Sequence, residues 1–315
     1  MSVNSDPAFL ILGGSGFVGR HLFATLGPGR ALATYHAKPF HGGVYFDATR
    51  MRLKDSLLGS RHAIRTAFLL YGVTNIDACA REPESTWLVN VKSMQQVIDD
   101  LVEAGIKPIY ASTDAVFDGS RGRWTEEDSP NPSLTYGKQK AEVERYLMSK
   151  RKPWIIARLS KIVGSDPGTH SLLGEWVRQI EAGQAIRCAT DLIFTPAHVD
   201  DVVAALVRLS GDSLSGIFNV CGPASMSRMD LLRTLLAEIR RYRQVKARVV
   251  PCSIRDFPFL EPRPLDGSMV PDKLYGILGR PFRDMESVCA ELALALFSGA
   301  SNRLAVEKSQ DSNLS

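Results

Sequence analysis

The sequence of 315 residues predicts an α/β fold, a doubly wound parallel sheet followed by a smaller C-terminal lobe. Short, continuous apolar runs alternate with stretches of helical spacing over the first half of the chain. A glycine-rich turn follows the first of these runs directly. After about Gly164 the rhythm loosens, and Gly-, Pro- and Asp-rich connections separate the remaining helical segments.

Five apolar runs are interpreted as buried strands, because continuous rather than alternating hydrophobicity indicates a strand covered on both faces. They are residues 8–12, 31–35, 67–71, 108–111 and 154–157. Helical spacing is found between them at residues 17–26, 84–104 and 134–148. Repeated strand–helix units with right-handed crossovers predict a Rossmann-type sheet.

The second half of the chain predicts a separate lobe. Helices are expected at residues 172–182, 199–209 and 229–241, and prolines are frequent from Pro251 to Pro281. We expect residues 1–164 to form the Rossmann domain, with later segments returning to it, and residues 165–297 to form mainly a substrate-binding lobe. The polar residues 298–315 are expected to be a disordered tail.

Composition excludes several classes of protein. The chain has 38 Lys and Arg against 34 Asp and Glu, and 44% hydrophobic residues, which is ordinary for a folded domain. The charges are spread along the chain, so no nucleic-acid partner is expected. The five cysteines share no C-x-x-C spacing, so neither a metal site nor a disulfide framework is expected. With no apolar run of roughly 18–20 residues, we expect a cytoplasmic protein without a membrane partner.

The glycine-rich segment at residues 13–19 reads Gly-Gly-Ser-Gly-Phe-Val-Gly and opens the first helix. Such glycines let backbone N–H groups and a helix N-terminus close on a pyrophosphate. The alternative is a plain turn between strand and helix. The position directly after the first buried strand favours dinucleotide binding.

The residues after the second strand favour NADP(H), with NAD(H) as the alternative. An NAD-binding Rossmann protein usually places Asp or Glu there, but residues 27–46 contain no acidic side chain. His36 and Lys38 stand where a 2′-phosphate would lie, unless they are ordinary exposed loop residues. Asp47 either meets the adenine or caps a turn.

The strongest constellation joins Thr113, in the segment Ser-Thr-Asp after a strand, with Tyr136 and Lys140. A spacing of four places Tyr136 and Lys140 on one helix face, where the ammonium is expected to lower the pKa of the phenol. The phenol then exchanges a proton with a substrate oxygen that the Thr113 hydroxyl holds. The alternative, a chance surface pair, is disfavoured by the glycine turn and the Ser-Thr-Asp segment together.

With these motifs, the chain resembles the extended short-chain dehydrogenase/reductases, and more narrowly the dTDP-4-dehydrorhamnose reductase family. The resemblance runs from about Phe9 to Leu274 and includes the segments at residues 13–19, 84–91, 112–119 and 136–140. It implies Tyr136 as proton donor, Lys140 holding the nicotinamide ribose, and Thr113 polarising the carbonyl. It implies a cofactor path along Gly13, Ser15, Gly16, Phe17, Val18, Asp47, Tyr71, Gly72 and Val73.

The expected function is therefore an NADPH-dependent reductase of a nucleotide-linked 4-keto-6-deoxy sugar. Asp114, Arg158 and Arg263 are expected to contact this substrate. The two arginines are expected to clamp its diphosphate, because arginine forks suit phosphate. For each arginine the alternative is an ordinary structural ion pair. The alternative functions are an epimerase or dehydratase of the same superfamily, and a non-catalytic nucleotide-binding regulatory subunit. A homodimer stays open.

Overall fold

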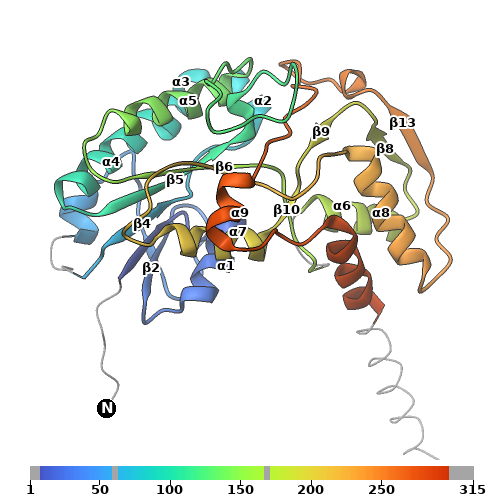
Figure 1. The fold of residues 1–315 in the computed structure, drawn as a ribbon, viewed down its shortest axis with the longest axis horizontal. Coiled ribbons are helices and arrows are strands. Elements are labelled where there is room, and N and C mark those ends of the chain that lie inside the picture. Colours follow the sequence, from blue (N-terminus) through green and yellow to red (C-terminus); the bar gives the residue numbers. More distant parts are fainter. Residues whose placement is uncertain (1–7, 59–62, 167–170, 298–315) are drawn as a thin grey trace, which may run out of the picture.

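The computed structural model describes residues 8–58, 63–166 and 171–297. Figure 1 shows one central sheet with helices on both faces and a second group of helices and short strands beside it. The expected tail, residues 298–315, lies outside the described residues. No helix in the described part of the chain is long and apolar enough to cross a membrane.

The central sheet has, within the described residues, seven strands in the order β11-β6-β5-β4-β1-β2-β3, all paired in parallel. The strands are β1 (Phe9–Leu12), β2 (Ala31–Tyr35), β3 (Gly43–Tyr45), β4 (Thr66–Leu69), β5 (Lys107–Thr113), β6 (Ile155–Leu159) and β11 (Gly216–Val220). The predicted α/β class and all five predicted strands are confirmed. Strand order reverses between β1 and β4, the point where open α/β sheets bind their ligands.

Helices cover both faces of the sheet (Figure 1). Successive residues of β1 explain why: Leu10 and Leu12 pack on the side of α4 and α5, whereas Ile11 packs on the side of α1 and α7. Each strand therefore needs apolar side chains on both faces. These helices and their neighbours are α1 (Phe17–Leu26), α2 (Ile76–Arg81), α3 (Pro83–Trp87), α4 (Ser93–Glu103), α5 (Thr135–Met148), α7 (Val199–Leu209) and α9 (Asp272–Leu278).

The predicted helix at residues 84–104 is present, but its course is not regular. A π-helical turn, Leu88–Lys92, separates α3 from α4. This turn contains Asn90, whose side chain is buried. Wide turns of this kind re-aim side chains and are frequent at functional sites.

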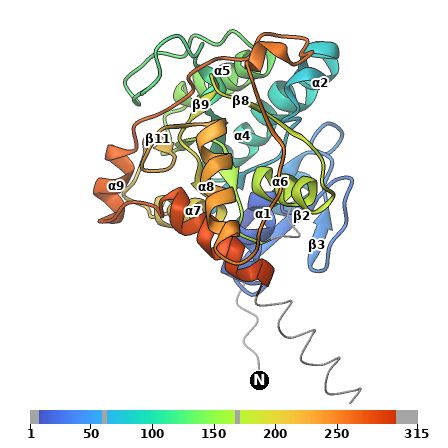
Figure 2. The same ribbon diagram turned by 90° about the vertical axis from the view of Figure 1, so that its right-hand side faces the viewer.

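The C-terminal lobe, defined here as α6, α8, β8, β13 and the helix at residues 285–297, has its own apolar core. Trp176, Leu232 and Val288 are among its buried members. Figures 1 and 2 show this group beside the sheet. The bounds of the remaining elements are α6 (Leu172–Glu181), α8 (Arg228–Arg240), and the strand pairs β8 (Ile186–Ala189) with β13 (Val249–Cys252), β7 (Ile162–Val163) with β10 (Ala197–His198), and β9 (Ile193–Phe194) with β12 (Met226–Ser227).

Candidate active site

The glycine turn between β1 and α1 packs closely on itself and on the loop after β4, which only glycine allows at two of its positions. Gly13 has a φ of +92°, and a Cβ there would lie 2.8 Å from the backbone carbon of Leu70. A Cβ on Gly19 would lie 2.3 Å from the Gly13 oxygen. Helix α1 begins after Gly16 with no side-chain cap and no acidic residue in its first turn. Its first N–H groups and its dipole therefore suit an anion such as a pyrophosphate.

Beside this turn, the loop after β4 is held by Asn90 from the π-helical turn. The Asn90 side chain accepts a hydrogen bond from Val73 N at 2.7 Å and donates one to Val73 O at 2.9 Å. It also donates to Gln139 Oε1 at 2.7 Å. Gly72, with a φ of +146°, lies directly against the Asn90 amide. The Asn90 side chain thus fixes the loop at residues 71–73, which the sequence predicts to line the cofactor path.

The residues predicted to select the cofactor lie together after β2 and β3. His36 and Lys38 are exposed, and His36 Nε2 lies 3.7 Å from Asp47 Oδ2. Asp47 accepts hydrogen bonds from the Thr49 hydroxyl and backbone, which lower the pKa of its carboxyl. This is the turn-capping alternative for Asp47. Arg50, which the sequence did not single out, adds a further exposed cation 3.6 Å from the same carboxylate.

Thr113, Tyr136 and Lys140 lie in one cleft, as the sequence predicted. Gly137 makes this approach of α5 to β5 feasible, because a Cβ there would lie 2.0 Å from the Ala115 oxygen. The Lys140 ammonium lies 5.9 Å from the centre of the Tyr136 ring and donates a hydrogen bond to Ala111 O at 2.8 Å. All three predicted catalytic side chains are largely buried.

The predicted lowering of the Tyr136 pKa by Lys140 is wrong for this structure. Burial raises the pKa of the phenol well above its usual range, and the Asp114 carboxylate raises it further, while the Thr113 hydroxyl acts in the opposite direction. Burial also lowers the pKa of Lys140, to about 8. The spacing Tyr-x-x-x-Lys predicts that the two groups are neighbours, but it carries no information on how dry their surroundings are. A protonated phenol is the form that donates a proton.

Asp114 is the acidic group of the cleft. Its carboxylate accepts a hydrogen bond from the Thr113 hydroxyl at 3.0 Å, and Ser160 Oγ lies 3.5 Å away. Burial raises its pKa to about 6, although Thr113 and the nearby Lys161 charge act in the opposite direction. Asp114 therefore changes its charge close to neutral pH, next to the predicted carbonyl-polarising hydroxyl.

These groups line a cleft of about 700 Å³ between the carboxyl ends of the strands and the C-terminal lobe. Of the residues predicted from sequence, its walls contain Gly16, Phe17, Val18, Tyr71, Gly72, Thr113, Asp114, Tyr136, Lys140 and Arg263. Gly13, Ser15 and Val73 belong to the same two loops without lining it. His36, Lys38 and Asp47 do not line the cleft.

The two arginines expected to clamp the substrate are both paired with carboxylates. Arg158 is 1% exposed and contacts both oxygens of the equally buried Glu144, at 3.1 and 2.8 Å. Arg158 does not line the cleft. Its contacts are those of the structural ion pair that the sequence left as the alternative. Arg263 does line the cleft, but its guanidinium lies 2.9 Å from Asp77 Oδ1.

The sequence interpretation did not select Asn90, Lys161 or Arg228. Asn90 lies within the segment at residues 84–91 that resembles the family, so this resemblance could have indicated it. Lys161 follows β6 at the edge where ligands bind, which is a weaker signal. Arg228 reaches the cleft from the second lobe, and no local pattern indicates that placement.

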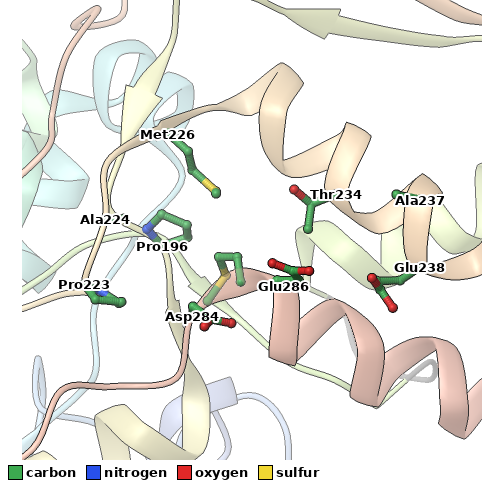
Figure 3. A pocket seen from close by; sticks show the side chains of 10 residues that line it. Pro196, Pro223, Ala224, Met226, Thr234, Ala237, Glu238, Asp284 and Glu286 are labelled. Atoms are coloured by element: carbon green, nitrogen blue, oxygen red, sulfur yellow. The ribbon is translucent and has the colours of Figure 1, made fainter.

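A second, smaller pocket of about 380 Å³ lies between α8 and the helix at residues 285–297 (Figure 3). It shares no lining residue with the cleft. Two of its three carboxylates are engaged locally: Glu238 pairs with Arg241 at 2.9 Å, and Asp284 accepts a hydrogen bond from Ser287 N. The chemistry therefore points to the larger cleft. Among the described residues, no group of His, Cys, Asp and Glu side chains is arranged to hold a metal ion.

The model of the RmlD substrate binding domain family matches residues 8–295. The chain belongs to this family. A probable low-salt glycan biosynthesis reductase of Haloferax volcanii is 30% identical over 161 residues, which cover 50% of this chain and 54% of that protein. The dTDP-4-dehydrorhamnose reductase of Aggregatibacter actinomycetemcomitans is 25% identical, over 65% of this chain and 72% of that protein.

The fold of this family member is shared with solved structures. The dTDP-4-dehydrorhamnose reductase of Bacillus anthracis, crystallised in complex with NADP, superimposes with a TM-score of 0.79 at 20% identity. The superposition covers 91% of this chain and 99% of that one. It confirms the expected fold class, and the family match confirms the resemblance stated from the motifs.

Proposed function

We propose that this member of the RmlD substrate binding domain family is an NADPH-dependent reductase of a nucleotide-linked 4-keto-6-deoxy sugar. The observation that carries the proposal is the meeting of Thr113, Tyr136 and Lys140 in one cleft, beside the uncapped start of α1. The relatives named dTDP-4-dehydrorhamnose reductase support the same reaction class.

The residues around the glycine turn fit a dinucleotide. Gly13 and Gly19 let the turn pack closely on itself and on the loop after β4, and the first N–H groups of α1 have no side-chain cap. His36, Lys38 and Arg50 supply exposed cations after β2 and β3, where the 2′-phosphate of NADP would lie. When bound, the cofactor supplies a hydride to the substrate carbonyl carbon.

The chain's own residues handle the oxygen of that carbonyl. The Tyr136 phenol keeps its proton, because burial raises its pKa, and donates it to the oxygen as negative charge develops there. The Thr113 hydroxyl lies beside the phenol, and it would orient the same oxygen by turning its proton from Asp114 toward it. The Lys140 ammonium, fixed on Ala111 O, holds the cofactor ribose and stabilises charge on the phenolate that remains. Burial of all three groups keeps water from the reacting centre.

A panel of nucleotide-linked 4-keto-6-deoxy sugars, incubated with NADPH and the purified chain, tests this function. We expect oxidation of NADPH with at least one member of the panel and a reduced sugar as product. Wild-type protein and the Tyr136→Phe variant are compared at equal cofactor occupancy. Oxidation that is equally fast with the variant, or absent with every sugar, overturns the proposal.

A further inference from the structure

Two cations in the cleft are not used by the reaction described above. Lys161 lies two residues after β6, and Arg228 is the first residue of α8 in the C-terminal lobe. Both line the cleft that contains Tyr136. Lys161 is exposed as a residue, and the pKa of its ammonium is lowered by loss of solvation and by repulsion from Arg228. The two positive charges therefore act on one another.

Neither cation has a carboxylate within ion-pair distance among the described residues. Asp114 and Glu175 attract the Lys161 ammonium only from a longer range. The Nε atom of Arg228 is buried and has no hydrogen-bond partner, while its guanidinium rests over the Trp176 ring at 5.4 Å from the ring centre. A buried donor without an acceptor is costly, and so are two neighbouring like charges. An anion bound by both cations would offset their mutual repulsion and would offer the guanidinium an acceptor.

The arginines expected from sequence to bind the substrate, unlike Lys161 and Arg228, each have a carboxylate partner. Arg158 is paired with Glu144 and lies outside the cleft lining, although its Nη1 atom is also buried without a hydrogen-bond partner. Arg263 lines the cleft but is already paired with Asp77. Only part of the positive charge of Arg263 is therefore open to a ligand. Apart from Lys140, which the reaction uses, the cleft cations without a carboxylate partner among the described residues are Lys161 and Arg228.

We propose that Lys161 and Arg228 form a receptor for the diphosphate of the nucleotide-linked substrate. A diphosphate presents several oxygens to a guanidinium fork and an ammonium together, and Trp176 holds that fork in place. Lys161 also lies within electrostatic reach of Asp114, which accepts a hydrogen bond from Thr113, so the receptor adjoins the reacting end of the cleft. This inference rests on the proposed function, because it names the part of that substrate which the cleft recognises. A carboxylate on the sugar has related chemistry and is the other source of an anion.

Calorimetric titration of the full chain, loaded with NADP⁺, with dTDP tests the receptor. We expect Lys161→Gln and Arg228→Gln each to weaken dTDP binding by about tenfold or more, as expected for the loss of a charged hydrogen bond. Arg228→Lys keeps the charge without the fork and should lie in between. Arg233→Gln is the matched control, an exposed arginine on the same helix that pairs with Asp230, and should bind dTDP like wild type. The NADP⁺ affinity and the thermal midpoint report whether each variant is folded.

A wild-type chain that binds no dTDP, or glutamine variants that keep its affinity within about twofold, overturn the receptor. A second titration compares UDP-glucuronic acid with UDP-glucose. If the variants lose only a preference for the uronic acid and keep dTDP affinity, the anion is a sugar carboxylate and the diphosphate assignment is wrong. The two proposals can fail separately. If the variants lose dTDP binding but the wild-type chain reduces no keto sugar, the receptor is supported and the proposed reaction is overturned. If the wild-type chain reduces a keto sugar but the variants keep their dTDP affinity, the proposed reaction is supported and the receptor is overturned.

Discussion

The ammonium of Lys140 donates a hydrogen bond to the backbone carbonyl of Ala111 at 2.8 Å, which joins helix α5 to strand β5. The helix carries Tyr136 and the strand ends in Thr113, so this contact helps to hold the phenol near the hydroxyl. The ammonium has no carboxylate within ion-pair distance among the described residues. Burial accordingly lowers the pKa of Lys140 to about 8, although Glu144 acts in the opposite direction.

Replacing Tyr136 by Phe removes the proton donor and little of the packing. We expect kcat to fall about 10²–10⁴-fold, the usual contribution of a positioned general acid, with NADPH binding retained. Steady-state kinetics and a fluorescence titration of NADPH measure the two quantities. A variant that keeps more than roughly a third of the wild-type kcat would show that another group donates the proton.

Replacing Asn90 by Ala leaves the Val73 backbone and the Gln139 side chain without their hydrogen-bond partners. We expect the free energy of unfolding to fall by about 1–3 kcal/mol and NADPH binding to weaken, because the loop after β4 loses its support. Ser85→Ala, an exposed change on the preceding helix, is the control. Unaltered cofactor affinity in a destabilised Asn90→Ala variant would limit Asn90 to a structural role.

Replacing Asp114 by Asn tests the raised pKa of this carboxyl. In the folded protein the pKa is about 6 against an ordinary 3.8, so the folded state binds the proton more tightly and wild-type stability falls as pH rises from about 4 to above 6. The Asn variant lacks this loss. We expect its free energy of unfolding relative to wild type to rise by up to about 3 kcal/mol between pH 4 and pH 8. Urea titrations at the two pH values measure it, and a difference independent of pH would show an ordinary Asp114.

Replacing Arg158 by Met separates a structural ion pair from a substrate clamp. Because Glu144 would be left as a buried, unpaired charge, we expect a loss of about 3–5 kcal/mol in the free energy of unfolding. Removing both charges, with Glu144→Leu added, should recover part of that loss. If instead Arg158→Met is as stable as wild type and binds dTDP poorly, the arginine reaches the substrate after all.

The cations after β2 and β3 predict a preference for NADPH over NADH. Charge-assisted contacts with phosphate contribute about 1.5–3 kcal/mol each, so we expect a preference of about tenfold or more. Lys38→Ala and Arg50→Ala should each reduce it, while NADH affinity stays constant. Titration with both cofactors is the measurement, and equal or tighter NADH binding by the wild-type chain contradicts the prediction.

Sequence patterns predicted the first half of the fold well, since strands buried on both faces and amphipathic helices have clear periodicities. The boundaries of α1 and α7 agree with those expected. The patterns did not predict strand β11, which contains Asn219 and pairs with β6 only after a long excursion through the C-terminal lobe. Pairing over such a sequence distance is a property of the whole fold rather than of a local segment.

In the candidate site, too, the residues placed by local patterns were predictable and those placed by tertiary packing were not. Thr113, Tyr136 and Lys140 were predictable because a strand end and a helix spacing place them. The partner of Arg158 was not, because Glu144 lies on another element and the burial of both groups depends on packing. Burial likewise decides the pKa of Tyr136, which reverses the direction expected from Lys140 alone. Arg228 enters the cleft only through the arrangement of the second lobe.

The most direct test of the reductase is a single-turnover reaction of the chain with deuterated NADPH and a nucleotide-linked 4-keto-6-deoxy sugar. We predict that one deuterium is transferred from the nicotinamide to the former carbonyl carbon, and that Tyr136→Phe slows this transfer without releasing the cofactor. Tight binding of both ligands with no transfer would contradict the account and favour a nucleotide-binding regulatory subunit. An altered sugar formed without net oxidation of NADPH would contradict it in favour of an epimerase or dehydratase.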